Sequence, residues 1–392
     1  GALMPYYRQV GDIPRKRHVA FRDDSGHRFH EELMGQEGFS SRSALLYHRH
    51  APSAITAVES STPPGSWGDA AGATPDHPLV PRHVRTGGFE PGDDLVTGRH
   101  LLLANADVRI AFARSSGTSP LYRSALGDEL VYVQSGQATL ESVFGALTAG
   151  SGDYVVVPSA TTHRWVVEHG EAEVLVMESR GHVSPPRRYL SAGGQFLEHA
   201  PYCERDLRAP AEPLTATGQE VDVLVRSPGG WTRHIHRDHP FDVVGWDGHL
   251  YPWAFNIADF EPIVGSIHQP PPVHQTFEGP GFVVCSFVPR RYDFHPDAIK
   301  VPYHHANTDS DEVLFYSAGD FMSRAGSGIG VGSISYHPAG FVHGPQPGSI
   351  EASLDKDRTE EVAVMIDTFA PLATSDAARA ASDPDYPFSW DR

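Results

Sequence analysis

The amino-acid sequence predicts a mainly β protein with two antiparallel barrels, an extended N-terminal arm and a short C-terminal helix. The chain of 392 residues contains 38 glycines and 33 prolines, which suits frequent turns between short strands better than long helices. Short runs of β-branched and aromatic residues occur in two separate series, one within residues 99–180 and one within residues 281–392. A chain of this length has room for two modest domains.

The N-terminal part is less regular. Residues 1–58 are polar and mixed, and we interpret them as an arm with strands. Within this arm, Glu31–Gly35 is interpreted as a short helical turn and Leu45–His48 as a strand. Residues 59–98 are rich in Ser, Pro, Gly and Asp, so we predict a long loop there instead of a regular element.

The two series of short runs give the expected barrels. We assign residues 99–180 to the first barrel, residues 181–280 to a connecting region, and residues 281–392 to the second barrel and tail. Within the tail, Ser375–Ser382 has the composition of a short helix with an acidic residue near its start. The expected strands are Leu101–Leu103, Val108–Phe112, Leu130–Val133, Ala138–Val143, Tyr154–Val157 and Val174–Met177 in the first series, and Phe282–Val288, Val313–Tyr316, Gly330–Ser335 and Val362–Phe369 in the second.

The two series share a residue pattern, which indicates an internal duplication. Each has a Glu, a Gly that closes a hairpin, and then a Gly, a Pro, a small residue and a His in that order. This pattern is the signature of a cupin barrel, so the chain is predicted to be a bicupin of double-stranded β-helix barrels. Tyr122 and Arg123 stand where the first copy needs a leading histidine, so we predict that this barrel is degenerate and structural. The matched positions are Glu129, Gly136, Gly152, Pro158, Ala160 and His163 in the first series, and Glu312, Gly319, Gly332, Pro338, Gly340 and His343 in the second.

The net charge and the cysteine content bear on the binding partners and the cellular compartment that we expect for the protein. The formal net charge is −18, so we do not expect the chain to bind nucleic acid or an anionic membrane surface. Only Cys203 and Cys285 are present, which favours a reducing cytoplasm over an oxidising compartment. No basic head followed by an apolar run opens the chain, so no signal peptide is expected. The longest apolar run, Phe282–Val288, is far too short to span a bilayer.

Three residues of metal-binding type recur in the second series at spacings that suit one small barrel: His305, Glu312 and His343. Two imidazoles and one carboxylate on one face of a metal leave positions open for substrate and O₂, as in non-haem Fe(II) oxygenases. We therefore predict an Fe(II) site on these side chains. His304 and Asp311 are competing ligands, but adjacent side chains point opposite ways in an extended segment. The cupin spacing favours Glu312.

A second histidine-rich stretch, His234–His239, looks by itself like a metal-binding motif. The chain contains 23 histidines, so a chance H-x-H is expected. No carboxylate-and-glycine pattern follows this stretch, and we interpret it as a polar strand face near a pocket or a subunit contact.

Four further stretches match the motifs of one enzyme family. They are His239–Gly248 (family pattern P-F-[ND]-V-V-[AG]-W-x-G), Phe287–Tyr292 (F-P-P-R-W), Pro302–Asn307 (P-Y-Y-H-R-N) and His343–Pro345 (P-H-G-P). On these motifs the chain resembles the homogentisate 1,2-dioxygenase family. The resemblance is spread over most of the chain and is tight between residues 239 and 345. The motifs are more specific than the bare cupin pattern, which serves many chemistries.

This resemblance implies roles for individual residues. Carried over position by position, it implies Fe(II) on His305, Glu312 and His343. His268 aligns with the active-site base of the family. His337, six residues before His343, falls where the family has another histidine beside the metal.

The chain also departs from the family pattern. His304 replaces a Tyr, and Phe321 stands where the family has a Tyr that contacts the bound ring. Loss of that hydroxyl removes a polar partner for the substrate, so a relative of homogentisate could be the substrate. Trp246, Tyr303 and Phe321 are candidate walls of the substrate pocket, to which residues 181–280 contribute.

The resemblance implies an Fe(II)-dependent dioxygenase that uses O₂ to open the ring of a dihydroxylated aromatic acid. Homogentisate, giving maleylacetoacetate in tyrosine and phenylalanine catabolism, is the first expectation. The family forms trimers and hexamers, so a homo-oligomer is implied. Two alternatives stay open: a cupin isomerase holding Zn²⁺ or Mn²⁺, with His304 or Asp311 as an added ligand, and a non-catalytic ligand-binding bicupin.

Overall fold

Strands make up almost all of the regular structure, as the sequence predicts, and they form a bicupin. The structure is a computed structural model that describes residues 6–62 and 72–392. Within these residues, no helix has the length and apolar character that crossing a bilayer requires. The chain folds into two units built from separate segments. The first unit contains residues 6–62, 91–99 and 113–256, and the second contains residues 72–90, 100–112 and 257–392.

The first unit begins with a four-stranded antiparallel sheet. The helical turn expected at Glu31–Gly35 is wrong, because this segment is a strand that pairs along its whole length with the next one. Its composition favours a helix locally, but cross-strand pairing and the burial of Met34 decide the outcome. The strands, in the order they lie in the sheet, are β1 (Arg8–Gly11), β19 (Val243–Gly248), β3 (Ser43–His48) and β2 (His30–Gly35).

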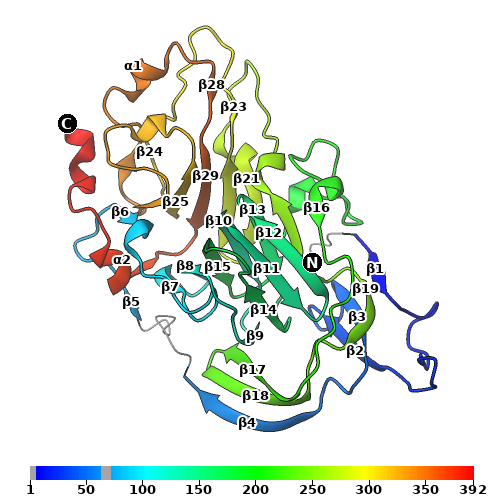
Figure 1. The fold of residues 1–392 in the computed structure, drawn as a ribbon. Helices are drawn as coiled ribbons and strands as arrows, with labels where there is room; N and C mark the ends of the chain where they lie inside the picture. Colours follow the sequence, from blue (N-terminus) through cyan, green and yellow to red (C-terminus); the bar gives the residue numbers. More distant parts are fainter. Residues whose placement is uncertain (1–5, 63–71) are drawn as a thin grey trace. The chain divides into compact units, whose positions relative to one another are not determined.

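The first barrel has two faces, both in the first unit. One face is a seven-stranded sheet and the other contains five strands. Figure 1 shows β4, β18 and β17 side by side at one edge of the larger sheet. The seven strands are β12 (Gly145–Gly150), β11 (Gln137–Ser142), β14 (His163–Val166), β9 (Leu121–Ser124), β17 (Gln219–Ser227), β18 (Gly230–Asp238) and β4 (Ile55–Ser61), and the five are β16 (Leu207–Arg208), β20 (Trp253–Asn256), β13 (Asp153–Val157), β10 (Glu129–Ser135) and β15 (Ala172–Ser179).

One apolar core joins these two faces. In β11 and β12 every second side chain is buried, which is the period expected of a strand with one face inward. The strands β10 and β13 lie in the middle of the other face and are almost wholly buried. Their apolar runs could be recognised in the sequence for this reason. The core contains Val131, Val155, Leu140, Leu147, Trp165, Tyr122 and Leu224 among others.

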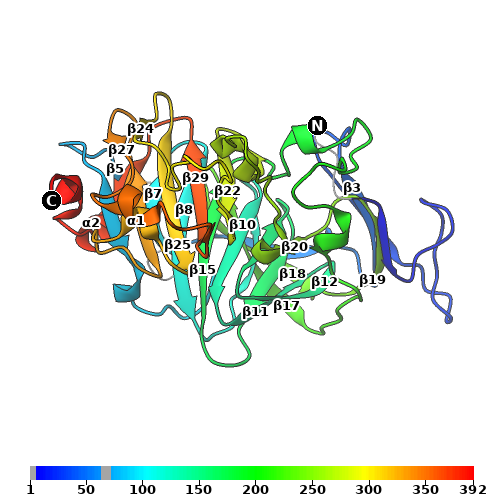
Figure 2. The same ribbon diagram turned by 90° about the horizontal axis from the view of Figure 1, so that it is seen from above.

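The second unit carries the second barrel. Figure 2 shows β22, β29 and β25 as neighbours, and they lie at the centre of a six-stranded antiparallel sheet. The six strands are β21 (Gln275–Gly279), β22 (Phe282–Phe287), β29 (Val362–Thr368), β25 (Asp311–Ala318), β26 (Ser333–His337) and β6 (Arg82–Arg85). Because β6 pairs with β26, the loop expected at residues 59–98 is interrupted by a strand there. Residues 63–71 of that loop lie outside the described residues.

Four further strands and several short pieces complete the second unit. The helix expected at Ser375–Ser382 forms as α2 (Asp376–Ala380), where Ser375 accepts a hydrogen bond from the amide of Ala378 as an N-cap. The remaining strands and helices are β8 (Val108–Ser115), β7 (His100–Ala104), β30 (Ala373–Ser375), β5 (Ala73–Thr74), β23 (Arg290–Arg291) with β28 (Arg358–Thr359), β24 (His305–Ala306) with β27 (Val342–His343), and α1 (Ser349–Ser353). The last three residues of β8 belong to the first unit.

The turns of the two barrels correspond, as a duplication requires. Gly136 and Gly319 follow equivalent strands and have φ of +75° and +88°. A side chain at either position would also clash with a backbone carbonyl of the neighbouring strand. Ala160 has a left-handed φ of +64° where the second copy has Gly340 at +90°. The chain path is therefore repeated even where the residue type is not.

Candidate metal centre

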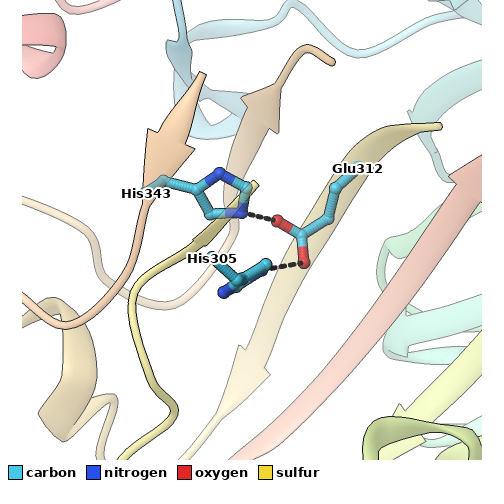
Figure 3. Close-up of side chains that lie close together, drawn as sticks. All are labelled: His305, Glu312 and His343. Carbon is cyan, nitrogen blue, oxygen red and sulfur yellow. Dashed lines mark ion pairs between the residues drawn. The ribbon is translucent and has the colours of Figure 1, made fainter. Parts of the chain in front are cut away.

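Three short elements of the second unit bring His305, Glu312 and His343 together. His305 in β24 lies directly opposite His343 in β27, and Glu312 is the second residue of β25. One ligand atom from each side chain lies within 4.8 Å of the other two. Figure 3 shows both imidazoles turned toward the carboxylate. The Nε2 atom of His343 is 2.7 Å from Oε2 of Glu312, and Nε2 of His305 is 4.0 Å from Oε1.

Backbone carbonyls fix the orientation of both imidazoles. Nδ1 of His305 donates to the carbonyl of Tyr303 at 3.0 Å, and Nδ1 of His343 donates to the carbonyl of Phe341 at 3.1 Å. Each ring therefore carries a proton on Nδ1 and turns its Nε2 toward Glu312. Metal-binding histidines are commonly oriented in this way: the ring nitrogen that does not bind the metal donates to a backbone carbonyl.

A second histidine and a tyrosine hold the carboxylate. Nδ1 of His337 donates to Oε2 of Glu312 at 2.8 Å, and the hydroxyl of Tyr386 donates to Nε2 of His337 at 2.6 Å. Burial opposes the ionisation of Glu312, but hydrogen bonds from His337 and His343 hold its pKa well below the usual range. Burial lowers the pKa of His337 to about 3, so this ring is neutral and has one defined tautomer.

An acid beside the triad has one buried oxygen without a hydrogen-bond partner among the described residues. This acid, Asp367, lies opposite Glu312 on the neighbouring strand, and the buried oxygen is its Oδ1. Burial, with a smaller effect from the charge of Glu312, raises the pKa of Asp367 to about 7. Two neighbouring buried carboxylates are unfavourable when both are ionised, and either protonation of one of them or a nearby cation relieves the repulsion. A divalent metal held by His305, Glu312 and His343 would supply such a cation.

The first barrel shows what replaces such a cation. Glu129 and Glu178 occupy the same opposed positions there. The buried guanidinium of Arg99 contacts both of them, at 2.9 and 3.1 Å. The hydroxyl of Tyr122, which stands in place of the leading histidine, donates to Glu129 at 2.6 Å. In this barrel an internal cation supplies the charge that a metal would supply in the second.

The competing ligands have other surroundings. His304 is exposed. Asp311 is buried and accepts hydrogen bonds from the hydroxyl of Tyr336 and from the amides of Ala339 and Leu372, at 2.8 to 2.9 Å. These bonds tie Asp311 to the strand ends around it.

The predicted base and pocket residues lie in different places. His268 is on an exposed segment, and its Nε2 is 3.5 Å from the hydroxyl of Tyr303, whose ring centroid is 6.3 Å from that of His305. Phe321 is 7% exposed and packs edge-on against Tyr316 in the same unit. The structure thus brings His268 and Tyr303 together, next to His305, one of the two histidines of the triad.

Trp246 belongs to the first unit and has the surroundings of a core residue. It is 0% exposed in β19, its Nε1 donates to the carbonyl of Phe144 at 2.8 Å, and its ring packs against Tyr251.

Several residues around the triad carried no recognisable motif. Tyr386 and Trp390 come from the C-terminal 3₁₀ helix (Tyr386–Asp391), and Nε1 of Trp390 donates to the carbonyl of Gly344 at 3.0 Å. The buried guanidinium of Arg324 donates to the same carbonyl. Only the register of Asp367 against Glu312 could have been inferred, by aligning the two barrels.

The chain is similar to proteins that are named as dioxygenases. The model of the N-terminal region of homogentisate 1,2-dioxygenase matches residues 97–257. The chain is 38% identical to "Putative dioxygenase SSO1533" of Saccharolobus solfataricus, over 99% of both proteins. It is 25% identical to homogentisate 1,2-dioxygenase of Emericella nidulans, over 71% of this chain and 65% of that protein. A solved cupin 2 conserved barrel domain protein from Leptotrichia buccalis gives a TM-score of 0.33 at 8% identity, over 74% of this chain and 98% of that one.

These matches confirm the resemblance seen in the sequence. The relative that covers the whole chain and the homogentisate enzymes are all named as dioxygenases. A metal cofactor is implied by that family, and the clustered His and Glu side chains provide donors for one. The chain belongs to the homogentisate 1,2-dioxygenase family of ring-cleaving bicupin dioxygenases.

Proposed function

We propose that the protein is an Fe(II)-dependent extradiol-type dioxygenase that opens the ring of a dihydroxylated aromatic acid. Homogentisate, converted with O₂ to maleylacetoacetate, is the first candidate. The observation that supports this proposal is the cluster of two Nε2 atoms and one carboxylate in a barrel whose duplicate holds an arginine instead. One buried oxygen of the neighbouring Asp367 has no hydrogen-bond partner among the described residues. A cytoplasmic homo-oligomer, a trimer or a hexamer, remains part of the prediction.

In this proposal His305, Glu312 and His343 hold the iron. Bound ferrous iron would supply open positions at which an aromatic diol and O₂ meet. The chain keeps the three donors ready: carbonyls fix the two imidazoles, while His337 keeps Glu312 ionised. Preset donors remove the need for reorganisation when the metal and substrate bind.

His268 is proposed to take the proton of a substrate phenol. It lies on an exposed segment, within reach of the hydroxyl of Tyr303, so solvent and substrate can both approach it. Imidazole is the side chain most often used to move a proton. Tyr303 would position the ring of His268 and, with Phe321, form part of the wall against which the substrate ring packs. Trp246 is retained as a predicted wall residue, although its observed contacts lie in the core of the first unit.

The substrate preference is proposed to differ from that of family members that place a tyrosine at the position of Phe321. A phenyl ring gives the substrate no hydrogen bond there. An active site without this hydrogen-bond donor accepts substrates that have no hydrogen-bond acceptor at the facing position. Gentisate and hydroquinone are therefore useful comparisons with homogentisate.

The test is oxygen consumption by the Fe(II)-loaded protein with homogentisate, gentisate and hydroquinone in turn. We expect uptake with at least one of these diols. His305→Ala and His343→Ala are expected to abolish both iron retention and oxygen uptake while circular dichroism stays unchanged. His304→Ala is the matched control, because it removes an exposed neighbouring imidazole and should retain both. Oxygen uptake that survives either triad variant would show that the metal ligands are misassigned.

A further inference from the structure

A cavity of about 360 Å³, with several charged residues in its lining, lies in the first unit. The triad residues belong to the second unit. Side chains of β2, β3 and β4 line it together with side chains of β9 and β18. Its size falls in the range of small-ligand sites. The histidine-rich stretch His234–His239, which the metal centre does not use, forms part of its wall.

Arg123 is the unusual residue of this cavity. Its guanidinium is largely buried, and burial lowers its pKa from the ordinary value. It donates to the hydroxyl of Thr162 at 2.8 Å, to Nδ1 of His234 at 3.2 Å and to Nε2 of His236 at 3.3 Å. A guanidinium has five N–H donors, so two remain without a partner among the described residues. No carboxylate of the described chain lies in ion-pair contact with Arg123.

The two histidines beside Arg123 cannot balance its charge. Burial and the nearby guanidinium lower the pKa of His234, and they lower that of His236 to about 4. Both rings are therefore neutral and accept hydrogen bonds from Arg123. The charge of Glu32 acts on Arg123 without an ion pair between them. A partly buried cation whose direct contacts are neutral is stabilised when an anion reaches it.

The opposite side of the cavity carries three acids, Glu32, Asp238 and Asp242. Two of them are hydrogen-bonded to one histidine. His48 is hydrogen-bonded to Asp242 at 2.6 Å and to Glu32 at 2.9 Å. Burial disfavours the charged form of His48, but these two bonds outweigh burial and raise its pKa to about 9. One imidazolium thus serves two carboxylates, and Asp238 adds a third acid to the lining. His50 also lines this side, 3.1 Å from Asp242 and 3.9 Å from Asp238. This side keeps an excess of negative charge.

We propose that the cavity binds a small zwitterion of the amino-acid class, with its carboxylate on Arg123 and its ammonium group toward Glu32, Asp238 and Asp242. The donors that remain on Arg123 are Nε–H and one Nη1–H, and a carboxylate can accept a charge-assisted hydrogen bond from either of them. An ammonium group at the other end would meet the excess of acid. A ligand with both charges compensates each side without adding net charge to the cavity.

Other ligand classes fit less well. Inorganic phosphate would bring up to two negative charges to one cation and face three acids. A metal ion at His234 and His236 would have to replace the guanidinium that already occupies their nitrogens. Among the residues that the structure describes, the triad is the cluster whose donor atoms are close enough to hold a metal, and this cavity contains no such cluster.

The proposal can be tested with three probes on one skeleton: 4-(aminomethyl)benzoate, which has both charges at opposite ends, benzoate and benzylamine. Calorimetric titration of the metal-loaded full chain is expected to show one site for 4-(aminomethyl)benzoate. Benzoate should bind at least about tenfold more weakly than 4-(aminomethyl)benzoate, since one charged contact is lost. Benzylamine should not bind measurably, because it has no anion for Arg123.

Variants identify the site. Arg123→Gln is expected to weaken binding of 4-(aminomethyl)benzoate by about tenfold or more. Arg237→Gln is the matched control: the same charge is removed from β18, which also contributes to the cavity wall, but this side chain is exposed and does not line the cavity. Arg123→Lys is the second variant, for use if Arg123→Gln does not fold. It keeps the charge but loses the guanidinium donors, so it should also weaken binding. His343→Ala should leave binding unchanged, which separates the cavity from the metal centre.

Three outcomes would overturn the proposal. The first is that none of the probes binds at millimolar concentration. The second is that Arg123→Gln and Arg123→Lys bind as tightly as the original protein. The third is that inorganic phosphate binds more tightly than 4-(aminomethyl)benzoate, in which case the cavity is an inorganic-anion site and not a zwitterion site.

Discussion

Removal of one hydroxyl, in Tyr386→Phe, tests whether the residues behind the triad control the metal. This hydroxyl donates to Nε2 of His337 at 2.6 Å, and Nδ1 of the same ring donates to Glu312 at 2.8 Å. The phenyl ring would remain to stack on His337 and to pack against Trp390. The change therefore removes a hydrogen bond and leaves the packing in place.

The expected magnitude follows from the burial of His337, which is 0% exposed. Loss of the Tyr386 hydroxyl leaves a buried ring nitrogen without its donor, at a cost of about 1–3 kcal/mol. If the proton of the His337 ring can then lie on either nitrogen, part of that cost is recovered. The hydrogen bond from His337 to Glu312 is then weaker. Changes of this kind beside a metal ligand typically reduce metal affinity by roughly 10- to 100-fold.

The assay is Fe(II) affinity by chelator competition, with kcat/KM for the best aromatic diol as a second measurement. Tyr336→Phe is the matched control: it removes a buried hydroxyl that donates to Asp311 at 2.9 Å, in the same sheet but outside the triad's hydrogen bonds. We expect Tyr386→Phe to lower Fe(II) affinity and Tyr336→Phe to lower only the unfolding temperature. Equal Fe(II) affinity in the two variants would refute the argument that Tyr386 and His337 position Glu312.

Two further predictions concern stability. Because the hydrogen bonds that His48 makes with Asp242 outweigh burial and raise its pKa to about 9, its stabilisation is fully present below about pH 6.5 and is lost as the pH rises through 9. Denaturant titrations at pH 6 and pH 9.5 should show a fall of up to roughly 3 kcal/mol that His48→Gln lacks, and an equal fall in that variant would contradict the assignment. Arg99→Met should destabilise the chain by about 3–5 kcal/mol, because it leaves Glu129 buried without its cation, whereas Glu178 keeps its ion pair with Arg226. A loss below about 1 kcal/mol would show that the first barrel does not depend on this guanidinium.

Most of the second barrel could be read from local sequence. The runs Phe282–Val288 and Val362–Phe369 are strands because continuous β-branched and aromatic residues suit a doubly buried position. The spacing between Glu312 and Gly319 is also local, since one strand and one tight turn set it. These features need no distant partner to be recognised.

Elements that depend on a partner were missed or misread. The strand β2 has the composition of a helical turn, and only its pairing with β3 makes it extended. The strand β6 lies in a polar, Pro-rich stretch, and its pairing with β26 in the second sheet is set by tertiary structure. Pairing energy between distant segments does not show in the propensity of either segment alone.

The sequence by itself determined the bicupin pattern, the three candidate ligands and the family, because each rests on residues at fixed local spacings. Tertiary structure decided the rest. It placed Tyr386 behind His337, it set Asp367 beside Glu312, and it placed Arg123 against two neutral histidines. These contacts join segments far apart in the chain, and their energies arise from burial and charge that exist only after the strands have packed.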